Sequence, residues 1–217
     1  MPHAEIMHFF LPEPAYDLWV AGELEEILGV PDGTRVEIIG GEIVVSPVPN
    51  FGHAGIANDI QDFFAVLAAT RPPFQWRAVQ GVGLNVSGVR DAYIPDLLVF
   101  DADAFARLRA QNSACVIPDQ IAMAIEITSP SNAADDRKPG RKRTRQTKWS
   151  GYAYEGIPYY LLIDRAPEII KATLYSEPDR KAGRYQTSVE WAFGETVELP
   201  EPFGVQIPTA GWQPWAE

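Results

Sequence analysis

The chain has 217 residues, of which 46% are hydrophobic and 22% charged, and its formal net charge is −11. These proportions exclude a disordered chain, and the length suits one well-buried domain without requiring a second. No apolar run reaches the roughly 20 residues that span a bilayer, and the single Cys115 excludes an internal disulfide and a cysteine-rich metal site. With no secretion-signal pattern at the N-terminus, we expect a soluble, cytoplasmic protein.

In the first half of the chain, periodicity alternates between helix and strand. Apolar residues at helical spacing predict a helix over 18–29 that ends at Gly29. A β-hairpin follows over 36–45, because Gly40-Gly41 accepts the positive φ angles of a tight turn. A second amphipathic helix is predicted over 53–69, and then two continuous β-rich runs over 77–86 and 93–100.

The second half continues the mixed pattern. A strand is predicted over 121–128, a helix over 141–155 that ends at Gly156, and a buried strand over 159–164. Another strand over 168–176 and β-like segments near Tyr185 and Phe203 complete the chain. We therefore predict one α/β domain over residues 1–217, with a core over about 35–175, an N-terminal helical arm and C-terminal strands packed on it.

A strongly basic segment interrupts this acidic chain. Seven cations and no acid lie between positions 137 and 148: Arg137, Lys138, Arg141, Lys142, Arg143, Arg145 and Lys148. The net negative charge argues against a nucleic-acid partner, but the local excess can form an edge that faces phosphates. Either a solvated face or a phosphate-binding edge fits the segment; in the second case its nucleic-acid contacts are Arg141, Lys142, Arg143 and Arg145.

Two carboxylates interrupt apolar β-runs. Asp96 precedes four apolar residues, and Glu126 has only apolar neighbours on its strand. An ionised carboxylate is costly to bury unless it is paired, hydrogen-bonded or bound to metal. Either acid alone has a structural explanation, but together on neighbouring strands they form a candidate oxygen site for Mg²⁺ or Mn²⁺.

A strand acid, then a second strand acid followed two residues later by a basic residue, is similar to the pattern of the PD-(D/E)XK nucleases. Pro95-Asp96 matches its first half. In the second half, Glu126-Ile127-Thr128 has Thr128 where that pattern has Lys. A positive charge must therefore come from another part of the chain.

The ordered motifs between Arg35 and Asp164 resemble a bacterial family, the Uma-type restriction endonucleases. The matching pieces are Glu37 to Pro47, His53, Pro95-Asp96, Glu126 to Ser131, Lys148, Tyr152, Gly156 to Tyr160, and Asp164. Each piece is weak by itself, whereas the ordered set is specific. Pro139-Gly140 departs from the pattern, and Asp135-Asp136 offers two acids where the family has one.

The resemblance implies a restriction-endonuclease-like core, with a mixed central sheet flanked by helices, and a metal-dependent endonuclease. Asp96 and Glu126 would hold Mg²⁺ or Mn²⁺ with the Ile127 carbonyl, and Lys148 would supply the displaced positive charge. Glu37 is a candidate third acid. Auxiliary candidates are His53, Asp136, Thr128 and Tyr152, although His53 also fits a capping or surface residue and Tyr152 a packing one.

Three functions fit the sequence. The first is metal-dependent hydrolysis of nucleic acid, with DNA as the expected substrate and a homodimer as the expected assembly. The second is a nuclease-like fold that serves only as a binding or dimerisation module, consistent with Thr128 and the acidic remainder of the chain. The third, an enzyme for a small phosphorylated ligand, lacks a glycine-rich phosphate loop and ranks last.

Overall fold

The computed structural model describes residues 11–31 and 33–216. The helices are α1 (Ala15–Ala21), α2 (Leu24–Leu28), α3 (Phe51–Thr70), α4 (Ala102–Gln111), α5 (Ala133–Asp136) and α6 (Lys148–Glu155), with a 3-10 turn η1 (Pro118–Gln120). No helix in the described ranges is long and apolar enough to cross a membrane.

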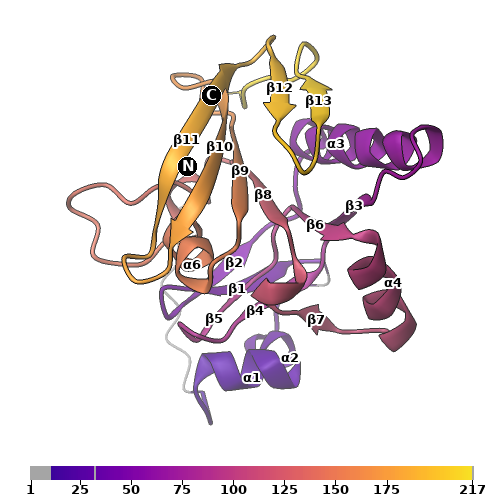
Figure 1. Ribbon diagram of the computed structural model, residues 1–217. Coiled ribbons are helices and arrows are strands. Elements are labelled where there is room, and N and C mark those ends of the chain that lie inside the picture. Colours follow the sequence, from indigo (N-terminus) through magenta and orange to yellow (C-terminus); the bar gives the residue numbers. More distant parts are fainter. Residues whose placement is uncertain (1–10, 32, 217) are drawn as a thin grey trace.

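The strands form two large sheets and a small C-terminal ribbon (Figure 1). The six-stranded sheet has the order β11-β10-β9-β8-β6-β3, and the five-stranded sheet the order β2-β1-β5-β4-β7. Six strands lie before residue 102: β1 (Arg35–Ile39), β2 (Glu42–Ser46), β3 (Trp76–Gln80), β4 (Gly83–Val86), β5 (Asp91–Tyr93) and β6 (Leu97–Asp101). Seven follow: β7 (Cys115–Val116), β8 (Met123–Ile127), β9 (Tyr159–Asp164), β10 (Lys171–Asp179), β11 (Arg184–Ala192), β12 (Thr196–Leu199) and β13 (Val205–Pro208).

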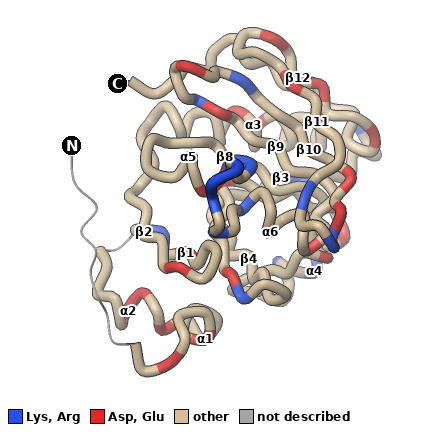
Figure 2. Tube along the Cα trace, turned by 90° about the vertical axis from the view of Figure 1, so that its left-hand side faces the viewer, with Lys and Arg blue, Asp and Glu red and all other residues tan. Residues whose placement is uncertain are grey.

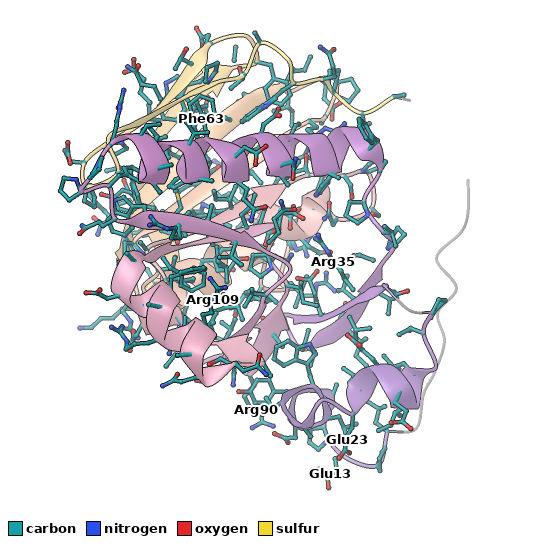
Figure 3. All side chains as sticks on the ribbon, turned by 90° about the vertical axis from the view of Figure 1, so that its right-hand side faces the viewer. Glu13, Glu23, Arg35, Phe63, Arg90 and Arg109 are labelled. Carbon is teal, nitrogen blue, oxygen red and sulfur yellow. The ribbon has the colours of Figure 1, made fainter. Side chains whose placement is uncertain are left out.

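The central strands β6, β8 and β9 of the six-stranded sheet are buried on both faces. Strand side chains alternate between faces, so Met123, Ile125 and Ile127 of β8 pack with α3 and the β12–β13 ribbon. Ala124 packs on the opposite face with α6 and the five-stranded sheet. Figure 3 shows α3 beside the C-terminal strands, with Phe63 on that side of the helix. Glu126 has the same strand parity as Ala124 and therefore faces α6.

Several predicted elements are confirmed and others are corrected. The hairpin is confirmed, with Gly40 and Gly41 at φ 58° and 78°. The helix predicted over 18–29 is two short helices, α1 and α2, because the chain turns at Gly22 with φ 76°.

The two predicted β-runs over 77–86 and 93–100 are each divided between the two sheets. The first breaks at Gly81, where φ is 68°, so that β3 and β4 belong to different sheets. The second breaks at residues 94–96, between β5 and β6. Asp96 therefore lies in the turn immediately before β6 and not within a strand.

The helix predicted over 141–155 is wrong in its first half, because α6 begins only at Lys148. Thr147 caps it, with its side chain accepting a hydrogen bond from Ser150 N while Ser150 Oγ accepts one from Thr147 N. This reciprocal capping fixes the first turn. Upstream, Arg143 and Arg145 turn away to bind acids elsewhere in the fold.

Two helical glycines are expected to respond oppositely to alanine substitution. A Cβ on Gly151 of α6 would collide with Tyr93 Oη, whereas a Cβ on Gly55 of α3 would meet nothing within 4 Å. We expect Gly151→Ala to cost about 1–3 kcal/mol of unfolding free energy by overpacking. Gly55→Ala should add about 0.5–1 kcal/mol through reduced backbone entropy in the unfolded chain. Urea denaturation of both variants checks this, and two shifts of the same sign would contradict it.

Candidate metal and catalytic site

Asp96 and Glu126 meet because β6 and β8 are antiparallel neighbours. Leu97 lies opposite Ile125, so the next step of the register places Asp96 opposite Glu126. Ile127 N donates a 2.8 Å hydrogen bond to Asp96 Oδ2. The N–H and C=O of one strand residue point to the same edge, so the Ile127 carbonyl lies on the edge of β8 that faces Asp96. Both acids are almost fully buried, with exposed fractions of 1% and 0%.

Asp96 is held by two basic side chains from other elements. Arg35 Nη1 of β1 donates to Asp96 Oδ1 at 2.5 Å, and His53 Nε2 of α3 lies 2.9 Å from the same oxygen. Figure 3 shows Arg35 near the N-terminal half of α3. Burial by itself raises the pKa of Asp96, but His53 and Arg35 outweigh it and lower that pKa to about 2. Asp96 is therefore ionised throughout the physiological range.

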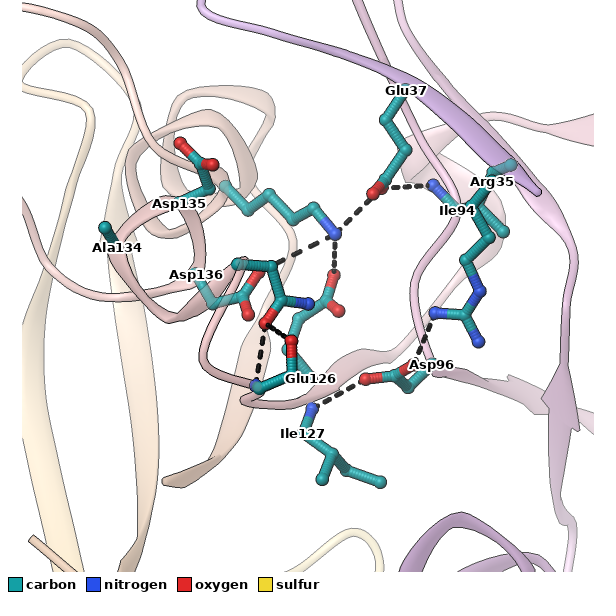
Figure 4. Close-up of polar contacts among 12 residues, drawn as sticks. Arg35, Glu37, Ile94, Asp96, Glu126, Ile127, Ala134, Asp135 and Asp136 are labelled. Atoms are coloured by element: carbon teal, nitrogen blue, oxygen red, sulfur yellow. Dashed lines mark hydrogen bonds and ion pairs between the residues drawn. The ribbon is translucent and has the colours of Figure 1, made fainter. Parts of the chain in front are cut away.

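Lys148 contacts three acids, Glu37, Glu126 and Asp136, which are labelled in Figure 4. Its Nζ is 2.7 Å from Glu37 Oε1, 3.1 Å from Glu126 Oε1 and 3.7 Å from Asp136 Oδ1. Glu37 Oε1 also accepts a 2.7 Å hydrogen bond from Ile94 N, in the turn that carries Asp96. Burial opposes the charge of Lys148, but the three acids outweigh it and raise the pKa of Lys148 well above its usual value. Lys148 is thus a permanent cation.

Three buried carboxylate oxygens of Glu126 and Asp136 lack a hydrogen-bond donor among the described residues. Glu126 Oε1 accepts a 2.5 Å hydrogen bond from Tyr152 Oη, which lies one helical turn after Lys148 on α6. Glu126 Oε2 and both carboxylate oxygens of Asp136 are buried without a hydrogen-bond donor among the described residues. Burial, together with Asp96 and Glu37, raises the pKa of Glu126 to about 7, and burial also raises that of Asp136 well above its usual value.

The cluster carries an excess of negative charge. Four buried carboxylates, those of Glu37, Asp96, Glu126 and Asp136, are close to two permanent cations, Lys148 and Arg35. His53 adds a third positive charge only when it is protonated. Bound protons or a further cation must offset the remainder, because an uncompensated buried charge costs several kcal/mol.

The donor atoms fit a hard divalent cation. Mg²⁺ and Mn²⁺ bind carboxylate and carbonyl oxygens, and a Mg²⁺ site commonly uses one or two carboxylates together with waters and substrate phosphate. Asp96, the unpartnered Glu126 Oε2 and the Ile127 carbonyl supply such oxygens. Among the described residues, no group of three or more His, Cys, Asp or Glu side chains is arranged to hold a metal. A metal here would therefore take further ligands from water or substrate.

Thr128, at the position of the motif lysine, stabilises the turn after β8 instead of facing the carboxylates. Its Oγ1 accepts a hydrogen bond from Arg165 N at 2.9 Å and lies 3.2 Å from Asp164 Oδ1, to which it donates. Asp164 in turn accepts two hydrogen bonds from the Arg137 guanidinium, at 2.6 and 2.7 Å. These hydrogen bonds hold Arg137, the first residue of the basic segment, at the C-terminal end of β9.

Of the four residues predicted to contact nucleic acid, two form ion pairs within the protein and two are exposed. Arg143 pairs with Asp135, and Arg145 pairs with both Asp135 and Glu42, so these two fasten the basic segment to α5 and the hairpin. Arg141 and Lys142 are exposed at its outer bend and have no ion pair among the described residues. Figure 2 shows the segment as a blue loop at the surface beside α6. Asp135 and Asp136 have different partners, because Asp136 contacts Lys148 whereas Asp135 pairs with Arg143 and Arg145.

Two features of the site were missed or misjudged in the sequence. Arg35 was not predicted, although it lies two residues before Glu37 on the same strand and so shares its face. His53 is buried, with 4% exposed, so a surface position is wrong for it. Asn50 caps α3 by accepting the hydrogen bond of His53 N, which leaves the imidazole to contact Asp96.

The mixed sheet, its flanking helices and the carboxylate cluster define a restriction-endonuclease-like fold. A crystal structure described as a "putative nuclease belonging to DUF820 from Anabaena variabilis" is similar to this one, with a TM-score of 0.57 and 20% sequence identity. The match covers 86% of this chain and 94% of that one. The family model Uma2, described as "Putative restriction endonuclease", matches residues 21–210, and the chain therefore belongs to this family. No curated protein matches the chain.

Proposed function

We propose that the protein is a Mg²⁺- or Mn²⁺-dependent nuclease that hydrolyses phosphodiester bonds, with DNA as the substrate. The observation that carries the proposal is the excess of buried carboxylate over permanent cations, with Glu126 Oε2 and both Asp136 carboxylate oxygens lacking a hydrogen bond among the described residues. Membership of the restriction endonuclease family supports the choice of nucleic acid as substrate. The predicted homodimer and cytoplasmic location stay predictions.

Asp96, Glu126 and the Ile127 carbonyl would hold the metal. When bound, the metal supplies a Lewis acid that makes a water molecule more acidic and offsets charge on the phosphate. The ionised state of Asp96 is maintained by Arg35 and His53, which keep its pKa at about 2. Tyr152 fixes the Glu126 carboxyl through Oε1 and thereby leaves Oε2 available as a ligand.

Lys148 supplies the cation that Thr128 does not. Glu37 and Glu126 hold its ammonium, so the positive charge has a fixed position beside Glu126, a candidate metal ligand. A preorganised cation at this position can orient the attacking water or stabilise charge that develops on the phosphate. Glu37 and Asp136 act as positioning residues, because they hold the Lys148 ammonium.

Cleavage of supercoiled plasmid or a labelled oligonucleotide in Mn²⁺ tests the proposal. We expect wild-type cleavage that stops in excess EDTA, and a loss of at least about a hundredfold in Asp96→Ala and Glu126→Ala, since even outer partners of metal ligands cost 10–100-fold. Glu42→Ala is the matched control, because Glu42 is an exposed hairpin carboxylate outside the cluster. Equal cleavage by the wild type and both cluster variants would refute the catalytic assignment. A wild type without cleavage would favour the binding module.

A further inference from the structure

A polar cavity separate from the acidic cluster lies between the basic segment, the first turns of α6 and the turn that joins β10 to β11. Its volume is about 460 Å³, within the range of small-ligand sites. Its lining includes four cationic side chains, those of Lys138, Arg143, Arg145 and Arg184. Tyr154, which is 46% exposed, contributes the accessible aromatic surface, while the buried Trp149 and Tyr185 line the inner wall. We call it the Trp149 pocket.

Two hydrogen-bond donors of the Trp149 pocket are unused. Trp149 Nε1 and Gln146 Nε2 are buried without an acceptor among the described residues. Trp149 is itself only 4% exposed, and an unmade hydrogen bond of a buried donor costs about 1–3 kcal/mol. Both residues line the pocket, so an acceptor group that entered it would complement these two donors.

Two of the pocket's cations are also available. Arg184 is largely exposed, and its contact with Asp179 is long at 3.9 Å. The Lys138 ammonium lies 5.6 Å from the centre of the Trp149 ring and has no acidic partner among the described residues. Arg143 and Arg145 are already paired with Asp135 and Glu42, so they shape the wall. The available charge is thus positive and lies next to aromatic rings.

The pocket is connected to the acidic cluster by the chain itself. The segment 137–147 begins directly after Asp136 and ends directly before Lys148, and both of these residues lie in the cluster. Trp149 follows Lys148 on the first turn of α6. A ligand in the pocket would consequently contact residues that are close in sequence to two members of the acidic cluster, Asp136 and Lys148.

We propose that the Trp149 pocket binds one nucleotide unit of an unpaired strand, with its phosphate at Arg184 and Lys138 and its base against the aromatic surface. Phosphate oxygens satisfy cations and N–H donors, and aromatic side chains bind bases whose faces are not covered by pairing. The proposal rests on the proposed function for the identity of the polymer. It adds that the preferred substrate has a single-stranded or frayed segment beside the cleaved bond.

Calorimetric titration of the full chain in EDTA tests the pocket without turnover. The probes are thymidine 5′-monophosphate, a ten-residue oligothymidylate and a duplex of equal length, which separate a free nucleotide, a single strand and paired DNA. We expect the oligothymidylate to bind more tightly than the duplex. Arg184→Gln and Lys138→Gln should each weaken it by about tenfold, since each removes a phosphate contact.

Lys181→Gln is the matched control, because Lys181 lies on the turn that leads into Arg184 of β11 but does not line the pocket. The affinity of Lys181→Gln for the oligothymidylate should stay within about twofold of the wild-type value, because an exposed charge outside the pocket is screened by salt. Trp149→Phe, which keeps a ring and removes the unused N–H, should also weaken binding. Equal losses in Arg184→Gln and Lys181→Gln, or tighter binding of the duplex, would overturn the proposal.

The outcomes for the pocket and for catalysis are separable. Single-strand binding that depends on Arg184, in a protein that does not cleave in Mn²⁺, would refute the nuclease and leave the pocket in place. Cleavage in Mn²⁺ by a protein whose affinity is unaffected by Arg184→Gln and Lys138→Gln would refute the pocket alone.

Discussion

Replacing Lys148 with methionine is expected to lower the free energy of unfolding by about 3–5 kcal/mol, the usual cost of removing one partner from a buried ion pair. Methionine keeps most of the side-chain volume, so a cavity contributes little. The loss comes from Glu37, Glu126 and Asp136, which would be buried without their shared cation. Urea denaturation followed by circular dichroism measures it.

The control for this prediction is Lys181→Met. Lys181 is exposed on the turn between β10 and β11, and its side chain has no hydrogen bond or ion pair among the described residues. Its replacement should change the unfolding free energy by no more than about 0.5 kcal/mol. A Lys148→Met protein within about 1 kcal/mol of the wild type would show that the acids carry protons in place of the lysine charge.

Local periodicity was sufficient for elements that keep one environment along their length. The hairpin β1–β2, the helix α3 and the buried strand β9 are of this kind, because a tight Gly-Gly turn, a 3.6-residue apolar repeat and a continuous apolar run each reflect local geometry. Their predicted positions agree with the structure to within a few residues.

Changes of partner along the chain were not predictable in the same way. The run over 77–86 is rich in β-forming residues along its whole length, yet β3 pairs with β6 while β4 pairs with β5 and β7. Both strands mix buried with half-buried residues, so their sequence pattern does not show which sheet each one joins. The helix α4 was not predicted, although Asp101 caps it and Asn112 ends it in a left-handed conformation. Phe105 and Leu108 are its only large apolar residues, so the helical spacing rests on a single pair.

Of the candidate site, the sequence indicated the acids better than their partners. Buried carboxylates are conspicuous in apolar strands, and Asp96 and Glu126 were therefore predicted as a pair. The role of Lys148 is indicated only by the family resemblance, because nothing in the local sequence distinguishes this lysine from the other six cations of the basic segment. The contact of Arg35 with Asp96 spans 61 positions and depends on how the two sheets meet. Such contacts follow from tertiary packing and not from local pattern.

A loss of Mn²⁺ affinity is expected in Glu126→Gln. Glutamine has the shape of the glutamate but a weaker, uncharged ligand oxygen, and the other proposed ligands stay in place. The pKa of Glu126 is already raised to about 7, so a neutral side chain at this position should fold well. The isosteric change therefore separates metal binding from stability.

Calorimetric titration of the metal-free protein with Mn²⁺ at pH 8 is the most direct test of the central claim. The acid cluster predicts one Mn²⁺ site in the wild type and in the exposed-acid control Glu42→Gln, with a loss of at least about tenfold in affinity for Glu126→Gln, because outer partners of metal ligands alone cost 10–100-fold. Thermal unfolding of each variant confirms that it is folded. Equal Mn²⁺ affinity in the wild type and Glu126→Gln, or no Mn²⁺ binding by the wild type, would contradict the assignment of Asp96 and Glu126 as a metal site.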